Sequence, residues 1–362
     1  MTALPQETLR RYPALDYGIV GEGERAILNL VEALERGQDL RMIESAAFRE
    51  GEEVIVNPRC KFIENLDRLP FPAYDLLLAY PQSYRPPFLN YLRGPTASLV
   101  SSRGCPQVCT FCDRSVFGNR YRYFSEDYLG ELIFYLRRQY QIRHLIFADD
   151  QFAASPTRLI RLCEKITSKN FGLFWNCDAR VDSMNWDLLK IMKRAGCWMI
   201  SYGIESGSQK ILDQIQKGIH LEQVDSIIRL TKKAGIRAKG HFMIGYPEET
   251  PETLRQTLAL ILNSPFDEIN LSFLTPYPGT QLYERMRHSP GFTEDWSRMN
   301  AMNLLLTPQA LSRKDLDEAF GKILRQFYMR PRVTFSYLSI LSRSPENGGR
   351  LLAGLCQWFR SR

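Results

Sequence analysis

The chain has few histidines and no long apolar runs. Only four of its 362 residues are histidine, so few imidazoles are available to complete a metal site. No stretch approaches the roughly 18 apolar residues that span a bilayer, and the first residues, MTALPQETLRRY, lack the apolar core of a signal peptide. We therefore expect a cytoplasmic protein whose eight cysteines are reduced thiols rather than disulfides.

Low-complexity tracts are also missing. The composition, 44% hydrophobic and 24% charged, is that of an ordinary globular protein and excludes disorder as the main state. The length exceeds one average domain, yet it suits a single barrel with attached extensions.

Acidic residues are nearly absent from the last part of the chain. Residues 322–362 hold eight basic residues and one acidic residue, Glu346, so the net charge of +7 is concentrated there. Aromatic and leucine side chains are interleaved with these charges, which is typical of a basic amphipathic helix on an anionic surface. Peripheral contact with the inner face of a membrane is one interpretation. We favour a helical cap that packs its apolar side on the core and leaves its charges in water.

What the sequence does contain is a regular alternation of β-rich and helical segments. The intervening segments carry apolar residues at helical spacing, as in the stretch that follows Ser125. This alternation predicts an α/β protein with a parallel sheet, either open or rolled into a barrel. The six predicted strands are residues 97–101, 144–148, 172–177, 198–203, 238–245 and 268–274.

Polar and turn-forming residues gather just after the ends of these strands. A cysteine-rich loop, an Asp-Asp pair and the segments NCDAR, GIESGS, GYPEET and PYPGT follow or end the strands in order. The carboxyl ends of parallel strands form one rim, and active sites of barrel and open α/β enzymes lie there. We therefore expect the chemistry at this rim.

Three cysteines, Cys105, Cys109 and Cys112, follow the first predicted strand with C-x3-C-x2-C spacing. A structural zinc site usually needs four ligands, and no fourth cysteine or histidine is evident nearby. An iron–sulfur cluster can be held by three thiolates, with one iron left open for another ligand. Gly104 gives the loop room to turn, and Phe111 is expected to shield the cluster from water.

The segments CPQVCTFC, GIESGS, GYPEET and PYPGT, in this order within residues 95–282, resemble the radical S-adenosylmethionine superfamily. The resemblance implies a partial (β/α)6, TIM-like barrel, a 4Fe-4S cluster on the three cysteines, and S-adenosylmethionine bound to the fourth iron. It also implies reductive cleavage of S-adenosylmethionine to methionine and a 5'-deoxyadenosyl radical that takes hydrogen from a substrate. A low-potential electron donor, such as flavodoxin or ferredoxin, is the implied partner. The protein itself would hold and orient the cofactor.

The same resemblance implies which residues contact S-adenosylmethionine. Glu205 matches a polar contact and Ser206 a neighbour of the ribose, with a helix cap at the strand end as the alternative. Arg180 matches a position that pairs with the cofactor's carboxylate, with an ion pair to Asp182 as the alternative. For His241 we favour a satisfied core histidine over a substrate contact.

One expected contact departs from the family pattern. Where many members have Gly-Gly-Glu, this chain has FADDQF, so the contact with the cofactor's amino group falls to Asp149 or Asp150. Gly245 and Pro247 match the loop near the ribose and adenine, and Pro276 matches a turn beneath the adenine or facing substrate. Turn formation alone is the alternative for each of these three.

Residues 14–78 resemble the last strand and helix of a cobalamin-binding Rossmann-type domain, followed by a hairpin and linker. The stretch RQFYMRPR is similar to the C-terminal region of the cobalamin-associated subgroup, especially members resembling anaerobic magnesium-protoporphyrin ester cyclase and hopanoid-modifying enzymes. The motif Asp-x-His-x-x-Gly is missing, and the first histidine is His144. We expect an N-terminally shortened member that does not bind cobalamin alone; a separate chain carrying that domain is the alternative. The expected parts are residues 1–90, a remnant and linker, 91–282, the barrel, and 283–362, a helical extension.

Three function classes follow. We favour a radical enzyme that methylates, cyclises or rearranges a small organic substrate, for which the aromatic C-terminal segment suggests a hydrophobic compound. The second class is a non-catalytic iron–sulfur or zinc protein, such as an electron carrier, a regulator or a decayed fragment. The third is an RNA-modifying radical enzyme. Charge confined to one aromatic segment, without an added RNA-binding domain, argues against the third.

Overall fold

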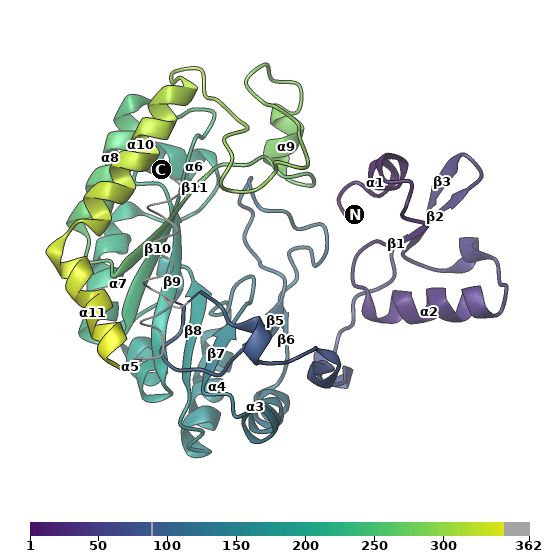
Figure 1. Ribbon diagram of the computed structural model, residues 1–362, viewed down its shortest axis with the longest axis horizontal. Helices are drawn as coiled ribbons and strands as arrows, with labels where there is room; N and C mark the ends of the chain where they lie inside the picture. The colour runs from purple at the N-terminus through teal and green to yellow at the C-terminus, as the bar shows by residue number, and fades with distance from the viewer. Residues whose placement is uncertain (88–89, 344–362) are drawn as a thin grey trace.

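A six-stranded parallel sheet forms the centre of the computed structural model, which describes residues 1–87 and 90–343 (Figure 1). Its strands are hydrogen-bonded in chain order, and every neighbouring pair is parallel. The first and last strands lie at opposite ends of this order, so the sheet is a partial barrel and all six predicted strands are confirmed. They are β4 (Thr96–Leu99), β7 (His144–Phe147), β8 (Phe174–Ala179), β9 (Cys197–Glu205), β10 (Arg237–Ile244) and β11 (Glu268–Phe273).

Helices connect these strands and cover the outer face of the sheet (Figure 1). The first begins where the sequence predicts, because the Ser125 side chain accepts a hydrogen bond from the Tyr128 N–H and caps the helix. Its apolar face, which includes Leu129 and Ile133, is buried in the main core. The helices are α3 (Glu126–Tyr140), α4 (Pro156–Ser168), α5 (Trp186–Arg194), α6 (Gln209–Gln214), α7 (Leu221–Lys233), α8 (Pro251–Asn263) and α9 (Gln281–Met286).

The amino end of the barrel is closed by apolar packing. His144, at the start of β7, is fully buried, and its two ring nitrogens contact the Leu92 N–H at 3.2 Å and Asn176 Oδ1 at 2.8 Å. Trp198 packs beside it with Leu92 and Ile340. This end therefore contributes stability.

Two C-terminal helices extend the barrel. α10 (Arg313–Tyr328) buries Leu316, Ile323 and Phe327 in the main core, and α11 (Pro331–Arg343) follows it. Both helices lie within residues 283–362, where the sequence predicts a helical extension, and the rest of the basic aromatic segment, 344–362, lies outside the described residues. Among the helices that are described, none is both long and apolar enough to cross a membrane.

The N-terminal unit, residues 1–56, lies beside the barrel (Figure 1). It contains α1 (Pro5–Arg11), β1 (Tyr17–Ile19), α2 (Glu24–Glu35), β2 (Ala46–Glu50) and β3 (Glu53–Val56). The predicted strand, helix and hairpin are all present, but the three strands form an antiparallel sheet in the order β1-β2-β3. A linker with short 3-10 turns at Leu66–Arg68, Tyr74–Leu76 and Gln82–Tyr84 leads to β4.

Candidate functional site

The three cysteines share one cavity after the carboxyl end of β4. Cys105, Cys109 and Cys112 line a space of about 260 Å³ together with Asp150 and Phe117. All three are free thiols; Cys109 is buried, Cys105 is half-buried and Cys112 is exposed. The sequence spacing therefore does bring three sulfur ligands to one concave site.

Gly104 allows the tight turn that begins the cysteine loop, residues 104–121. Its φ is +81°, and a Cβ atom there would lie 2.3 Å from the carbonyl oxygen of Arg120. Its N–H donates a hydrogen bond to Asp150 Oδ2 at 2.8 Å. Only glycine fits this close approach, as the sequence predicts.

Backbone hydrogen bonds fix the cysteine loop against the barrel rim. The Thr110 N–H donates to the Ile215 carbonyl at 3.0 Å, and the Leu282 N–H donates to the Thr110 carbonyl at 2.9 Å. Within the loop, the Cys112 N–H donates to the Cys109 carbonyl at 3.2 Å. The cysteines are thus held by segments that follow β9 and β11 as well as by their own strand.

Two buried cations lie close to the thiols. Lys217 Nζ forms an ion pair with Glu205 Oε1 at 2.7 Å, and it also lies 5.8 Å from the centre of the Phe111 ring. Arg180 binds Asp182 through two hydrogen bonds of 2.9 and 2.7 Å, which is the alternative expected for it. Arg180 is nevertheless buried, and its Nη1 atom has no hydrogen-bond partner. A buried guanidinium with an unpaired nitrogen is suited to bind an anionic ligand.

These surroundings alter the acidity of the cysteines. A hydrogen bond with the Cys112 thiol lowers the pKa of Cys109 to about 6, and the positive charges of Lys217 and Arg180 add to that lowering. The same contact raises the pKa of Cys112, and burial raises the pKa of Cys105. One thiol is therefore prepared to be a thiolate near neutral pH, and thiolate is the form that binds metal.

The loop after β10 also reaches the cysteine site. Tyr246 is fully buried without a hydrogen-bond partner for its hydroxyl, and burial, then Glu205, Glu249 and the cysteines, raise its pKa. Gly245, at φ +93°, donates its N–H to Glu249 Oε2 at 2.9 Å. Glu249 is buried, and the hydrogen bond that it accepts from the Gly245 N–H fixes the conformation of this loop.

The two aspartates after β7 bind the protein itself. Asp149 is buried and accepts hydrogen bonds from the Ser101 N–H at 3.1 Å, the Ser101 hydroxyl at 2.8 Å and the Ser102 hydroxyl. Burial raises its pKa. Asp150 is exposed, accepts from the Gly104 N–H and lines the cysteine cavity. Of the two, Asp150 therefore stays the better candidate for the cofactor's amino group.

The remaining predicted positions lie at the rim with different exposure. Ser206 is fully buried, 3.3 Å from the Thr257 hydroxyl, and it accepts from the Ser208 N–H, so it caps its own loop. Pro247 is half-buried and Pro276 is buried. Contacts of these residues with the ribose or adenine stay predictions.

His241 is placed differently from the expectation. Its side chain is 31% exposed, and Nε2 lies 3.9 Å from Asp178 Oδ1, so a satisfied core histidine is wrong. β9 lies between β8 and β10, and the residue paired with His241 there is Gly203, which has no side chain. The two side chains meet across β9 on the face of the sheet that the helices leave uncovered, because Asp178 is itself 63% exposed. The uncovered face of the sheet thus carries His241 and Asp178 side by side near the carboxyl ends of the strands.

The cysteine cavity offers three thiols, and three thiolates can hold an iron–sulfur cluster with one iron left open. In the described part of the chain, no three histidine, cysteine or carboxylate side chains converge to hold one ion. Cys60 contacts Ser45 instead, and the described Cys163, Cys177 and Cys197 are buried in the core. A closed four-thiolate zinc site is thus not formed by the described residues.

Lys217 and Tyr246 are the residues that sequence reasoning missed. Lys217 follows α6 in a stretch without a recognisable motif, and its contact with Glu205 forms only when β9 and the next loop fold together. Tyr246 lies in the GYPEET segment, but nothing in the sequence indicates that its hydroxyl group is buried.

Comparisons with known proteins agree with this geometry. A family model described as Radical SAM superfamily matches residues 99–261. The chain is 32% identical over 337 residues to an uncharacterized methyltransferase of Pyrococcus horikoshii, which covers 92% of this chain and 72% of that protein. It is 28% identical over 347 residues to the anaerobic magnesium-protoporphyrin IX monomethyl ester cyclase of Cereibacter sphaeroides, covering 93% of this chain and 55% of the cyclase.

Solved structures share the fold. The cobalamin-dependent S-adenosylmethionine radical enzyme OxsB, with aqua-cobalamin and S-adenosylmethionine bound, superposes with a TM-score of 0.71 at 18% identity, covering 97% of this chain and 58% of that one. The radical S-adenosylmethionine methyltransferase TsrM of Kitasatospora setae gives 0.69 at 19% identity, covering 86% and 63%. The family model and the 32% identical relative, together with this shared fold, show that the chain belongs to the radical S-adenosylmethionine superfamily.

Proposed function

We propose that the chain is a radical S-adenosylmethionine enzyme that modifies a small organic substrate by methylation, cyclisation or rearrangement. The observation that carries this proposal is the convergence of three free thiols on one cavity. The positive charge of Arg180, a buried arginine with an unpaired nitrogen, acts on two of these cysteines, Cys105 and Cys109. Cys105, Cys109 and Cys112 would hold a 4Fe-4S cluster, which when reduced supplies the electron for cleavage of S-adenosylmethionine.

The chain's own residues then bind and orient the cofactor. Arg180 would receive its carboxylate through the nitrogen that lacks a partner, while Asp182 keeps the guanidinium in place. Asp150, exposed at the cavity, would accept from its amino group. Glu205 takes part through Lys217, because its carboxylate is already bound to that ammonium. Phe111, whose ring centre lies 5.8 Å from the Lys217 ammonium, would shield the cluster from water.

The substrate would enter over the uncovered face of the sheet. This face presents the His241–Asp178 pair and Asn270, an exposed residue of β11 that is paired in register with His241. These groups can donate and accept hydrogen bonds, so the substrate we propose carries polar groups there. That makes a wholly hydrophobic compound a poorer fit than the sequence alone suggested.

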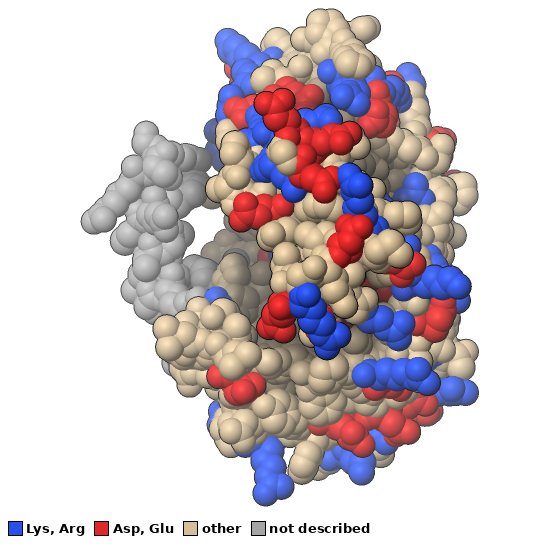
Figure 2. Space-filling view, turned by 90° about the vertical axis from the view of Figure 1, so that its right-hand side faces the viewer, with Lys and Arg blue, Asp and Glu red and all other residues tan. Residues whose placement is uncertain are grey.

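Nucleic acid is not favoured as the substrate. Figure 2 shows Lys and Arg side chains interspersed with Asp and Glu over the face on the side of the N-terminal unit, rather than a broad basic surface. A basic stripe is the usual footprint of nucleic-acid binding. A salt-sensitive shift of tRNA in a gel would contradict this view.

The first test is the identity of the bound metal. The protein is reconstituted anaerobically with iron and sulfide, and iron, sulfide and zinc are then quantified beside the electron paramagnetic resonance spectrum of the reduced sample. We expect iron and sulfide in cluster ratio, and a spectrum that changes when S-adenosylmethionine is added. Cys109→Ala is the control and should retain neither. Zinc without iron in the wild type would refute the proposal.

The remaining parts of the proposal concern cobalamin and partners. The chain spans 55% of the length of the cyclase it matches, and two solved relatives of the same fold are described with cobalamin bound. That the chain alone does not bind cobalamin stays a prediction. Stoichiometric corrinoid absorbance in the purified protein would contradict it. Flavodoxin or ferredoxin is the electron donor we propose, and stimulation of S-adenosylmethionine cleavage by either one tests it.

A further inference from the structure

The cysteine loop leaves and re-enters the fold through a very short ribbon. β5 (Ser102–Arg103) and β6 (Arg122–Tyr123) pair antiparallel over two residues each. An isolated two-stranded ribbon is at best marginally stable in water. Another part of the protein must therefore hold the two ends of the cysteine loop together.

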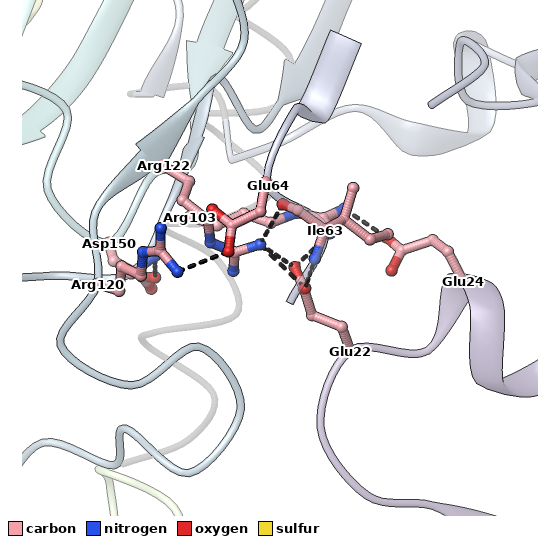
Figure 3. Close-up of polar contacts among 9 residues, drawn as sticks. Glu22, Glu24, Ile63, Glu64, Arg103, Arg120, Arg122 and Asp150 are labelled. Atoms are coloured by element: carbon pink, nitrogen blue, oxygen red, sulfur yellow. Dashed lines mark hydrogen bonds and ion pairs between the residues drawn. The ribbon is translucent and has the colours of Figure 1, made fainter. Parts of the chain in front are cut away.

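A buried carboxylate from the N-terminal unit bridges both strands of this ribbon. Glu22, whose side chain is 2% exposed, accepts hydrogen bonds from Arg103 Nη1 and Arg122 Nη1, each at 2.9 Å (Figure 3). It also accepts from the Ile63 N–H at 2.9 Å. One side chain thus joins the N-terminal unit, the linker and both ends of the cysteine loop.

The surrounding groups complete this buried network. Arg103 also binds Glu24, and Arg122 Nη1 donates to the Ile63 carbonyl at 2.7 Å (Figure 3). The Arg122 guanidinium lies 4.5 Å from the centre of the Phe62 ring. Glu22 and Arg122 are buried and the Arg103 side chain is 13% exposed, whereas Glu24 is 38% exposed and adds a negative charge at the edge of the network. Removing the charge of Glu22 therefore leaves these mostly buried arginines without compensation.

The network reaches the cavity wall within a few residues. The Arg103 guanidinium lies 5.4 Å from the centre of the Phe117 ring, and Phe117 lines the cysteine cavity. Gly104, the next residue after Arg103, is bound to Asp150, which lines the same cavity. A shift of Arg103 would therefore move the wall and the turn that precedes Cys105.

We propose that Glu22 is a positioning residue for the three-cysteine site, clamping both ends of the cysteine loop and so setting the cavity in which the cluster is held. The statement about the cluster rests on the proposed function. The clamp itself does not, because all of its contacts are made by the polypeptide alone. Retention of the cluster then depends on the N-terminal unit as well as on the barrel.

The clamp is tested first by hydrogen exchange of the full-length, metal-free protein. Glu22→Gln keeps the size of the side chain and removes its charge. We expect exchange in residues 102–123 to become faster by about tenfold or more, because a buried pair is broken, while β8, β9 and β10 keep their protection. Glu64→Gln is the matched control, since Glu64 pairs with Arg120 of the same loop at 2.6 Å, with both side chains more than half exposed (Figure 3). Unchanged protection in Glu22→Gln, or an equal loss throughout the barrel, would overturn the proposal.

Cluster retention is the second readout. After anaerobic reconstitution, the visible absorbance of the cluster is followed in the presence of an iron chelator. The electron paramagnetic resonance spectrum of the reduced cluster is also recorded. Glu22→Gln should lose the cluster several-fold faster and show a broadened spectrum, Glu22→Asp should be intermediate because it keeps the charge, and Glu64→Gln should match the wild type. Equal loss rates and spectra in all variants would contradict the positioning role. If the wild type takes up no iron, the proposed function fails, and the exchange experiment still decides the clamp.

Discussion

Two buried lysine–glutamate pairs lie in the same barrel with different neighbours. Lys217 and Glu205 are 2.7 Å apart, and the cysteine thiols sense the charge of both. Lys239 and Glu268 are 2.6 Å apart in register on β10 and β11, and Glu268 raises the pKa values of Tyr328 and Tyr337 after burial itself. The chemistry of the pairs is the same. Lys217–Glu205 lies at the carboxyl end of β9 and affects the cysteine site. Lys239–Glu268 lies within β10 and β11 and joins these two strands.

The largest expected contrast is between cysteines. Cys105→Ala should lower bound iron to the background level, because the cavity then offers two thiols, and it should leave the free energy of unfolding nearly unchanged. Cys177→Ala, inside β8, should keep full iron content and lose about 1 kcal/mol of stability. Metal analysis and urea unfolding measure the two effects. Full iron in Cys105→Ala would show that the cluster is held elsewhere.

Lys217 and Lys239 should differ in their effect on the cluster but not in their effect on stability. Lys217→Met and Lys239→Met should each lose about 3–5 kcal/mol of stability, since each leaves a buried carboxylate unpaired. Only Lys217→Met should move the reduction potential of the cluster to a more negative value, because a nearby positive charge favours the added electron. A redox titration followed by electron paramagnetic resonance measures the shift. Equal potentials in wild type and Lys217→Met would remove the distinction between the pairs.

The third prediction concerns pH at the closed end of the barrel. Burial lowers the pKa of His144 to about 4, and the hydrogen bond with Asn176 only partly opposes this. Between pH 6.5 and about 4 the unfolded chain binds a proton that the folded protein does not, so stability falls by up to ~1.4 kcal/mol for each unit of decreasing pH. His144→Gln should flatten this dependence in urea unfolding. A slope unaffected by His144→Gln would contradict the assignment.

The sequence predicts the repeating parts of this molecule better than its contacts. Strand and helix positions follow from local periodicity, so Ser125 and the six strands were found, and Gly104 follows from the tight turn. Partners distant in sequence were not found: Glu22 is 81 residues from Arg103 and 100 residues from Arg122. Such pairs depend on how whole units pack, which no local pattern encodes.

Contacts between residues distant in sequence also decide which polar residues at the rim are free to bind a ligand. Asp149 and Ser206 are predicted to lie at the cofactor, and in the structure they also bind backbone and hydroxyl groups of neighbouring loops. From the sequence alone, a polar residue after a strand looks free to bind a ligand. In the folded protein, such a residue can instead hydrogen-bond to backbone groups that would otherwise be buried without a partner. Among the buried candidates, Arg180 Nη1 and Asp149 Oδ2 have no hydrogen-bond partner.

The most direct test is formation of 5'-deoxyadenosine. The reconstituted, reduced protein is incubated anaerobically with S-adenosylmethionine, and 5'-deoxyadenosine and methionine are quantified by chromatography beside Cys109→Ala. We expect the wild type to release both products in equal amounts and the variant to release neither. Iron bound in cluster ratio without any 5'-deoxyadenosine, under the same reduction, would contradict a radical enzyme and favour a non-catalytic iron–sulfur protein.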